Sequence, residues 1–139
     1  MKHVLVVANR TLCEQHLIDE VHRRRKAGEV TFHVLVPAAS SGTWTWTEAG
    51  AYEDARARLD ELLETLAIAG VGATGEIGDA SPVAAVDDLL RTRKFNEIIV
   101  STLPQGASRW LQGNVVRRIA AHSGLPVTHV VAEQLPLEV

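Results

Sequence analysis

Apolar residues follow two alternating spacings along the chain. Val4–Ala8 is a run of consecutive apolar residues, which is typical of a strand buried on both faces of a sheet. Cys13, Leu17 and Val21 then follow at intervals of four, which places them on one face of a helix. Gly28 ends this pattern, because glycine commonly follows the last helical residue. The first 28 residues therefore predict a strand and then a helix.

The next stretch repeats this order. Val30–Val36 is rich in β-branched residues and stops at Pro37, which indicates a second strand. A polar loop that contains Trp44 and Trp46 comes next. A long helix closed by Gly70 follows, and its apolar face consists of Ala51, Ala55, Leu59, Leu62, Leu63, Leu66 and Ala69.

The second half of the chain continues the alternation. Ala73–Ile77 is a third predicted strand, and Ser81 with Pro82 has the form of an N-cap and a first helical residue. The buried face of this third helix consists of Val83, Val86, Leu89 and Leu90.

A final strand, helix and strand complete the pattern. Glu97–Ser101 is the fourth predicted strand, Gly124 ends a fourth helix, and Pro126–Val131 is the fifth strand. The apolar stripe of the fourth helix consists of Leu111, Val115 and Ile119. Five strands and four helices in strict alternation predict an α/β, three-layer doubly wound sandwich with a parallel sheet. We expect it to form a single domain over residues 1–139.

Composition excludes several classes of partner. The net charge of −3 provides no basic field for nucleic acid or an anionic membrane. Arg23–Lys26 lies at the end of the first predicted helix, where cations complement exposed carbonyl groups; an anion-binding patch is the alternative. Cys13 is the only cysteine, and no apolar run has the length of a membrane span. We therefore expect a cytoplasmic protein.

Catalytic and metal-binding patterns do not occur in the sequence. The six histidines lack metal-ligand spacing, and neither a nucleophile elbow nor a P-loop is present. Asp87 and Asp88 face different ways on a helix, and Asp79 is expected to support the entry of the third helix. We expect neither an enzyme nor a metal protein.

A ligand site is expected where the order of strands reverses, beyond the carboxyl ends of the sheet. If the first strand is central, this point lies between it and the fourth strand. The loops Ala8–Thr11 and Ser101–Arg109 would then face each other. The second loop offers hydroxyl groups, a glycine, an arginine and a helix start, which together suit an anion. A capped helix start without a ligand contains the same parts.

The element order, the loop after the fourth strand and the ending "GLPVTHVVAE" resemble the universal stress protein family over nearly the whole chain. Leu125, Pro126 and Val127 correspond to the short sequence with which members begin their last strand. The resemblance implies a five-stranded parallel sheet in the order 3-2-1-4-5. It also implies a homodimer, in many members paired through the last strand.

The nucleotide-binding branch of that family has Gly-x-x-Gly, nine residues and then Gly-Ser or Gly-Thr. The corresponding positions here are Ser101 to Pro104, eight residues, and then Gly113 and Asn114, so only the final glycine matches. Pro104 fixes φ and has no N–H to donate to phosphate. Asn9 and Arg10 stand where the family's binders place an aspartate.

Two functional hypotheses follow. In the first, a non-catalytic protein weakly binds ATP, another adenine nucleotide or a small anion, through Asn9, Arg10, Ser101, Thr102, Gly106, Ser108, Arg109, Gly113 and Asn114. In the second, the chain is a dimeric interaction or regulatory module of the branch that binds no ATP. Trp44, Trp46 and Trp110 offer flat surfaces on which a base could stack or a lid that excludes water; the alternative is that they pack onto the sheet edge or a partner subunit.

Overall fold

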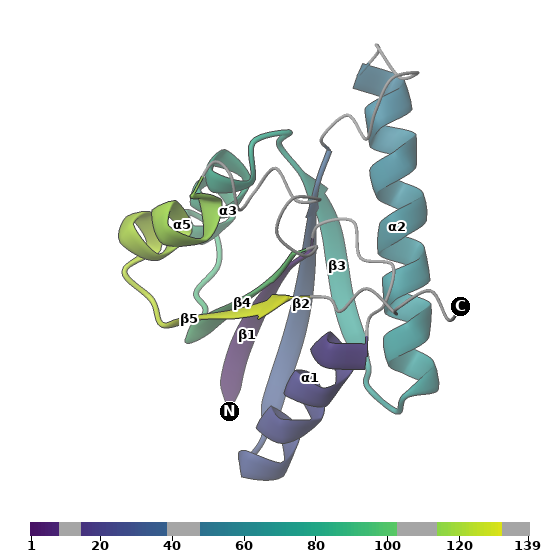
Figure 1. Cartoon of the computed structure of the whole chain (residues 1–139), viewed down its shortest axis with the longest axis vertical. Helices are drawn as coiled ribbons and strands as arrows, with labels where there is room; N and C mark the ends of the chain where they lie inside the picture. The colour runs from purple at the N-terminus through teal and green to yellow at the C-terminus, as the bar shows by residue number, and fades with distance from the viewer. Residues whose placement is uncertain (9–14, 39–47, 103–113, 132–139) are drawn as a thin grey trace, which may run out of the picture.

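A computed structural model of the 139-residue chain describes residues 1–8, 15–38, 48–102 and 114–131 (Figure 1). Its centre is a five-stranded parallel sheet in the order β3-β2-β1-β4-β5. The strands are β1 (Lys2–Ala8), β2 (Val30–Pro37), β3 (Ala73–Gly78), β4 (Glu97–Thr102) and β5 (Val127–Val131). The described helices are α1 (Gln15–Ala27), α2 (Glu48–Ile68), α3 (Pro82–Leu90) and α5 (Val115–Ser123). The predicted fold class and strand order are confirmed.

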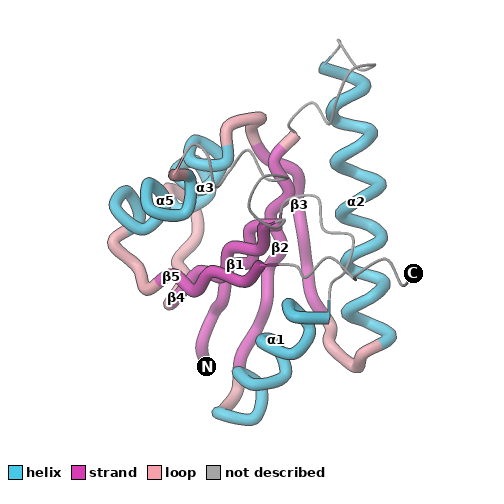
Figure 2. The backbone as a smooth tube through the Cα atoms, viewed as in Figure 1, coloured by secondary structure: helices cyan, strands magenta, loops and turns pink. Residues whose placement is uncertain are grey.

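Helices cover both faces of the sheet, as Figures 1 and 2 show. One core layer lies under α1 and α2 and contains Val4, Val6 and Ile99. The other lies under α3 and α5 and contains Leu5, Val7 and Ile98. Consecutive residues of β1 and β4 thus point into different layers, which explains why these strands are continuously apolar.

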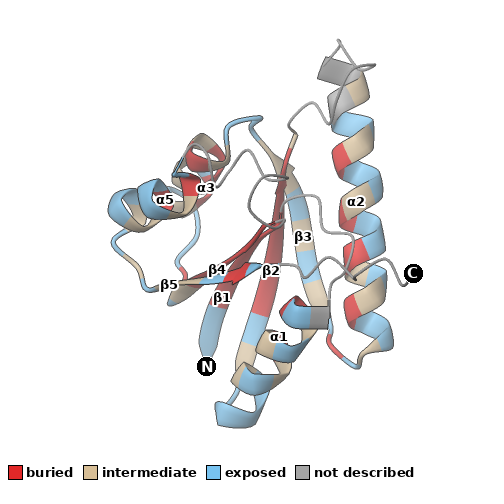
Figure 3. Ribbon diagram, viewed as in Figure 1, coloured by how far each residue is buried: buried red, intermediate tan, exposed pale blue. Residues whose placement is uncertain are grey.

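The central strands are the most deeply buried part of the molecule (Figure 3). Leu17 and Val21 on α1 are buried against them, as the spacing of four predicts; Cys13 lies outside the described residues. The predicted stripe of α2 is also confirmed at its buried positions, which are Ala55, Leu59, Leu62 and Leu66.

Local signals fixed the ends of α3 and α5. Ser81 Oγ accepts a hydrogen bond from the N–H of Ala84 at 3.3 Å, so Ser81 is the predicted N-cap with Pro82 as the first helical residue. Asp79 Oδ1 accepts from the N–H of Ser81 at 2.9 Å, which confirms its role at the helix entry. Gly124 ends α5 with φ of 66°, a left-handed conformation that suits glycine.

Several boundaries differ from the predictions by up to three residues. β1 begins at Lys2 rather than Val4, because Lys2 and His3 pair with Val30 and Thr31 although their side chains are exposed. α2 begins at Glu48, before the first apolar residue of its stripe. Polar residues at an element's end carry no hydrophobic period, so pattern alone does not reveal them.

Arg24 connects α1 to the sheet through an ion network that the sequence did not predict. Its guanidinium donates to the carboxylates of Glu20 and Glu97 and, at 2.8 Å, to the hydroxyl of Thr128. Burial alone would lower the pKa of Arg24, but its hydrogen bonds to Glu97 and Glu20 outweigh burial and raise it. Arg24 therefore does more than complement the end of the helix.

Candidate functional site

The carboxyl ends of β1 and β4 lie side by side in the sheet. Ala8, the last residue of β1, pairs with Ser101, and β4 ends one residue later at Thr102. β2 and β3 extend the sheet on one side of β1, and β4 and β5 extend it on the other. The strand order therefore reverses between β1 and β4, which is the position where open α/β sheets bind ligands.

Three of the nine predicted site residues are described, and they are Ser101, Thr102 and Asn114. The remaining site residues lie outside the described residues; they are Asn9, Arg10, Gly106, Ser108, Arg109 and Gly113. Pro104 and the three tryptophans, Trp44, Trp46 and Trp110, lie outside as well. Contact between these residues and a ligand stays a prediction.

Ser101 and Thr102 are buried and belong to opposite faces of the sheet. Ser101 is 1% exposed and shares its face with Ile99, under α1 and α2. Thr102 is 0% exposed and shares its face with Val100, under α3 and α5. Side chains alternate along a strand, so the two hydroxyl groups point away from each other.

Thr102 is held by the edge strand β5. Its hydroxyl lies 2.6 Å from Nε2 of His129, a hydrogen bond that joins the last residue of β4 to β5. Partial burial lowers the pKa of His129, so the neutral imidazole is favoured. A residue of the predicted binding segment Ser101–Arg109 is thereby fixed in position.

Asn114 is the N-cap of α5 and has φ of 54°, in the left-handed region. Asparagine tolerates this conformation better than most residues with a Cβ. Its side chain is exposed and makes no capping hydrogen bond, while its carbonyl accepts from the N–H of Arg118 at 3.0 Å. The side-chain amide of Asn114 is thus not used to begin the helix.

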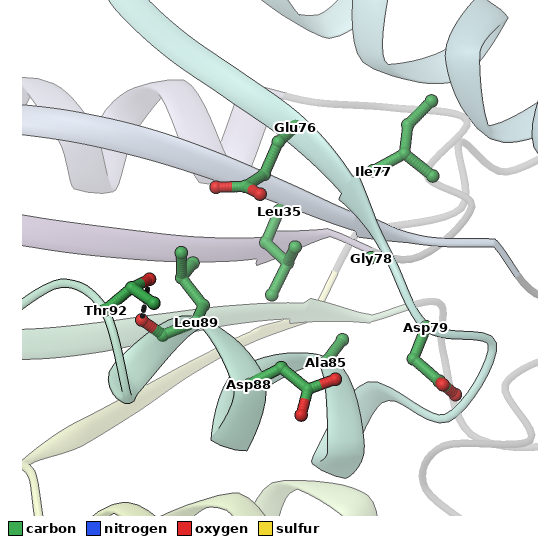
Figure 4. A pocket seen from close by; sticks show the side chains of 9 residues that line it. All are labelled: Leu35, Glu76, Ile77, Gly78, Asp79, Ala85, Asp88, Leu89 and Thr92. Atoms are coloured by element: carbon green, nitrogen blue, oxygen red, sulfur yellow. Dashed lines mark hydrogen bonds between the residues drawn. The ribbon is translucent and has the colours of Figure 1, made fainter.

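A separate cavity of about 310 Å³ lies between β3 and α3 (Figure 4). Leu35, Ala85 and Leu89 form its apolar part, and carboxylates lie at its margins. The acidic residues that line it are Glu76, Asp79 and Asp88. Three carboxylates oppose the binding of a phosphate, so this cavity does not extend the predicted anion site.

The described residues contain no group of three or more histidine, cysteine, aspartate or glutamate side chains that could hold a metal ion. Within the same residues, no helix is both long enough and apolar enough to cross a membrane.

Sequence reasoning missed the partners of the strand histidines. His129 bonds to Thr102, His3 Nδ1 lies 2.7 Å from Thr31 Oγ1, and His33 Nδ1 lies 2.6 Å from Thr74 Oγ1. Each histidine thus meets a threonine on the neighbouring strand. Only the register of the parallel strands brings these residues together, and no motif in the sequence signals it.

The sheet order and the reversal point define the class of protein: a doubly wound α/β domain whose strand order reverses between β1 and β4. Within this class, the chain has the fold of the universal stress protein family, which two solved structures display. A universal stress protein family protein from Arabidopsis thaliana with AMP bound is 14% identical, with a TM-score of 0.63 over 96% of this chain and 93% of that chain. One from Burkholderia pseudomallei is 13% identical, with a TM-score of 0.65 over 93% and 95%.

The likeness to these two proteins is found by comparing structures and not by comparing sequences. No family model matches the chain, and no curated protein matches it.

Proposed function

We propose that the chain is a divergent universal stress protein that binds an adenine nucleotide weakly, without catalysing a reaction. The observation that carries the proposal is the pairing of Ala8 with Ser101, because it starts both predicted binding loops at one point of the sheet edge. The Arabidopsis thaliana protein of the same fold was solved with AMP bound, which makes AMP the first ligand to test.

The proposed roles follow from the chemistry of each loop. Arg109 and the hydroxyl of Ser108 would meet the phosphate at the helix start, with Gly106 allowing close approach of the backbone. Asn9 and Arg10 would lie across from them, where Asn9 binds the ribose or base and Arg10 offsets phosphate charge. Ser101 and Pro104 stand in place of two motif glycines, which removes backbone flexibility, and Pro104 also lacks an N–H donor, so we expect weak affinity.

Titration with AMP, ADP and ATP tests this proposal. Amide NMR signals of Ala8, Ser101 and Thr102 should shift in a saturable way, and the melting temperature should rise with ligand concentration. Arg109→Ala should weaken AMP binding by about tenfold, the usual effect of removing a charged hydrogen-bond donor. Arg117→Ala removes the same charge from an exposed position on α5 and is the matched control.

Two outcomes would contradict nucleotide binding. One is the absence of any saturable shift at about 10 mM nucleotide, where even a millimolar site is mostly occupied. The other is an equal loss of affinity in the Arg109 and Arg117 variants, which would indicate general charge attraction rather than a site.

One observation favours the second candidate function, a dimeric interaction or regulatory module without a ligand. The hydroxyl of Thr102 is already bonded to His129, and the side chain of Ser101 is buried, so neither is offered openly to a phosphate. β5 is an edge strand, and the exposed Val131 at its end suits a partner surface. A homodimer by light scattering, with no response to nucleotide, would support this module over the nucleotide-binding form.

A further inference from the structure

The amino-terminal half of the sheet carries polar side chains on the face that α3 and α5 cover elsewhere. Leu35 is buried in the core of this face, but Thr31 and His33 precede it on the same side of β2. Thr74 and Glu76 occupy the same side of β3. A doubly wound sheet ordinarily buries apolar residues on both faces, so this polar area departs from the rule.

A cavity of about 410 Å³ lies at this position, at the opposite end of the strands from the reversal point. We call it the amino-edge recess. The residues that line it include His3, Thr31, His33, Thr74, Arg93 and Phe95. Its volume is within the range of small-molecule pockets.

His33 lines the recess, and both of its ring nitrogens already have hydrogen-bond partners. Its Nε2 lies 2.8 Å from Glu76 Oε1, so this nitrogen carries a proton and donates to the carboxylate. In the neutral ring Nδ1 then accepts from the hydroxyl of Thr74, at 2.6 Å. Glu76 is thereby engaged by His33, and it is not among the residues that line the recess.

Arg93 supplies a cation at the same recess. Its Cζ lies 5.2 Å from the centre of the Phe95 ring, and that ring stacks on His33 with centroids 6.1 Å apart. Among the described residues, no carboxylate forms an ion pair with Arg93. Stacking engages the face of a guanidinium and leaves its N–H edge able to form paired hydrogen bonds with an oxyanion.

His3 supplies a second nitrogen donor to the lining of the recess. Its Nδ1 bonds to Thr31, so Nε2 is the ring nitrogen left to meet a ligand. The His3 backbone is fixed to the loop that carries Arg93: the N–H of His3 donates to Asn96 Oδ1 and its carbonyl accepts from the N–H of Asn96, both at 2.7 Å. Arg93 and His3 therefore lie on segments that are hydrogen-bonded to each other without a ligand.

We propose that the amino-edge recess binds a small phosphate-bearing molecule, either inorganic phosphate or a phosphate ester. Arg93 binds two phosphate oxygens, Nε2 of His3 binds a third, and the hydroxyl groups of Thr31 and Thr74 border the site. An unliganded polar surface would explain the paired hydrogen bonds of the histidines. The proposal rests instead on Arg93, an exposed arginine that lies over the Phe95 ring at the mouth of a cavity and has no carboxylate partner among the described residues.

Titration with inorganic phosphate and with glycerol 3-phosphate at constant ionic strength tests the proposal. We expect saturable shifts of the His3 ring and Arg93 Nε NMR signals, with the amides of Ala8 and Ser101 unchanged. Higher affinity for glycerol 3-phosphate than for inorganic phosphate would favour an ester as the ligand. Equal affinity for the two would favour free phosphate. Because the readouts lie at opposite ends of the strands, failure here is distinguishable from failure of nucleotide binding.

Arg93→Gln should weaken phosphate binding about tenfold or more, as expected for loss of a charged donor. Lys94→Gln removes the same charge one residue away, outside the recess lining, and should bind as the unmodified chain does. His3→Gln is the second variant and should also weaken binding. The proposal is overturned if no signal saturates by about 10 mM phosphate, if Arg93→Gln binds normally, or if Lys94→Gln loses as much affinity as Arg93→Gln.

Discussion

The hydroxyl of Thr102 lies 2.6 Å from Nε2 of His129, and this bond ties the end of β4 to the edge strand β5. Thr102 is itself a predicted binding residue, and it is the last described residue of the predicted binding segment Ser101–Arg109. His129 lies on the strand through which related folds are expected to pair. This side-chain contact adds to the backbone pairing of the two strands, in which Thr102 pairs with Val131.

We expect the His129 ring to titrate below the ordinary histidine pKa of about 6.5. A lowered pKa in the folded state means that the unfolded chain takes up this proton more readily, so the free energy of unfolding falls as the pH drops through the ordinary histidine range. A pH titration of the ring signals by NMR measures the pKa directly.

The effect of His129 protonation on the free energy of unfolding can be tested with two variants. His129→Gln should reduce the loss of unfolding free energy between about pH 7.5 and pH 5.5, whereas Thr102→Val should leave a titrating ring in place. A His129 ring that titrates at or above the ordinary value would show that its burial has no such effect.

The Arg24 network should contribute far more to stability than the neighbouring surface pair. Arg24→Met leaves the carboxylates of Glu20 and Glu97, which are 12% and 16% exposed, without their shared cation, and should cost about 1–3 kcal/mol. Arg23 also pairs with Glu20, but its side chain is 74% exposed. Arg23→Met should therefore change the free energy of unfolding by less than about 0.5 kcal/mol. Urea unfolding of both variants checks the difference, and equal losses would contradict it.

Close packing of β3 against α3 should make Gly78 intolerant of a side chain. A Cβ at Gly78 would lie 2.8 Å from Ala85 Cβ and 2.9 Å from Leu35 Cδ1, so Gly78→Ala should destabilise the fold by about 1–3 kcal/mol. A Cβ at Gly72 would meet nothing within 4 Å. Gly72→Ala should be neutral or stabilise by up to about 1 kcal/mol, because it restricts the unfolded chain. Thermal and urea unfolding measure both, and a harmless Gly78→Ala would mean that α3 can move away from the sheet.

The positive φ of Asn114 predicts an unusual order of substitutions at the start of α5. Asn114→Ala places a less tolerant residue in the left-handed region and should cost about 1 kcal/mol. Asn114→Gly should be close to neutral, since glycine adopts this conformation freely. The free energy of unfolding from urea titration checks this order, and an Ala variant as stable as the Gly variant would contradict it.

Most of the strands and helices could be predicted from the spacing of apolar residues along the chain. Continuous apolar runs such as Val4–Ala8 identified strands buried on both faces, and spacings of four such as Leu17 and Val21 identified helices. Capping chemistry at Ser81 and Gly124 located two helix ends. Polar ends of elements, such as Lys2 and His3, joined the sheet through backbone pairing that leaves no hydrophobic signature.

The site was less accessible to sequence reasoning. Chain order and the reversal rule located the meeting of Ala8 and Ser101, because this follows from topology alone. The bond from Thr102 to His129 and the stack of Arg93, Phe95 and His33 depend on strand register and loop path, which the pattern of apolar residues does not encode. Most of the predicted binding residues lie outside the described residues and stay predictions.

The central position of β1 also shapes how the chain reaches its native state. One edge of β1 pairs with β2, which begins at Val30, but its other edge pairs with β4, which begins at Glu97. That second edge therefore has no partner during most of synthesis on the ribosome. Contacts between residues so far apart in sequence slow folding and expose apolar strand edges in the meantime. Nascent chains that end before β4 should consequently be the most dependent on chaperones.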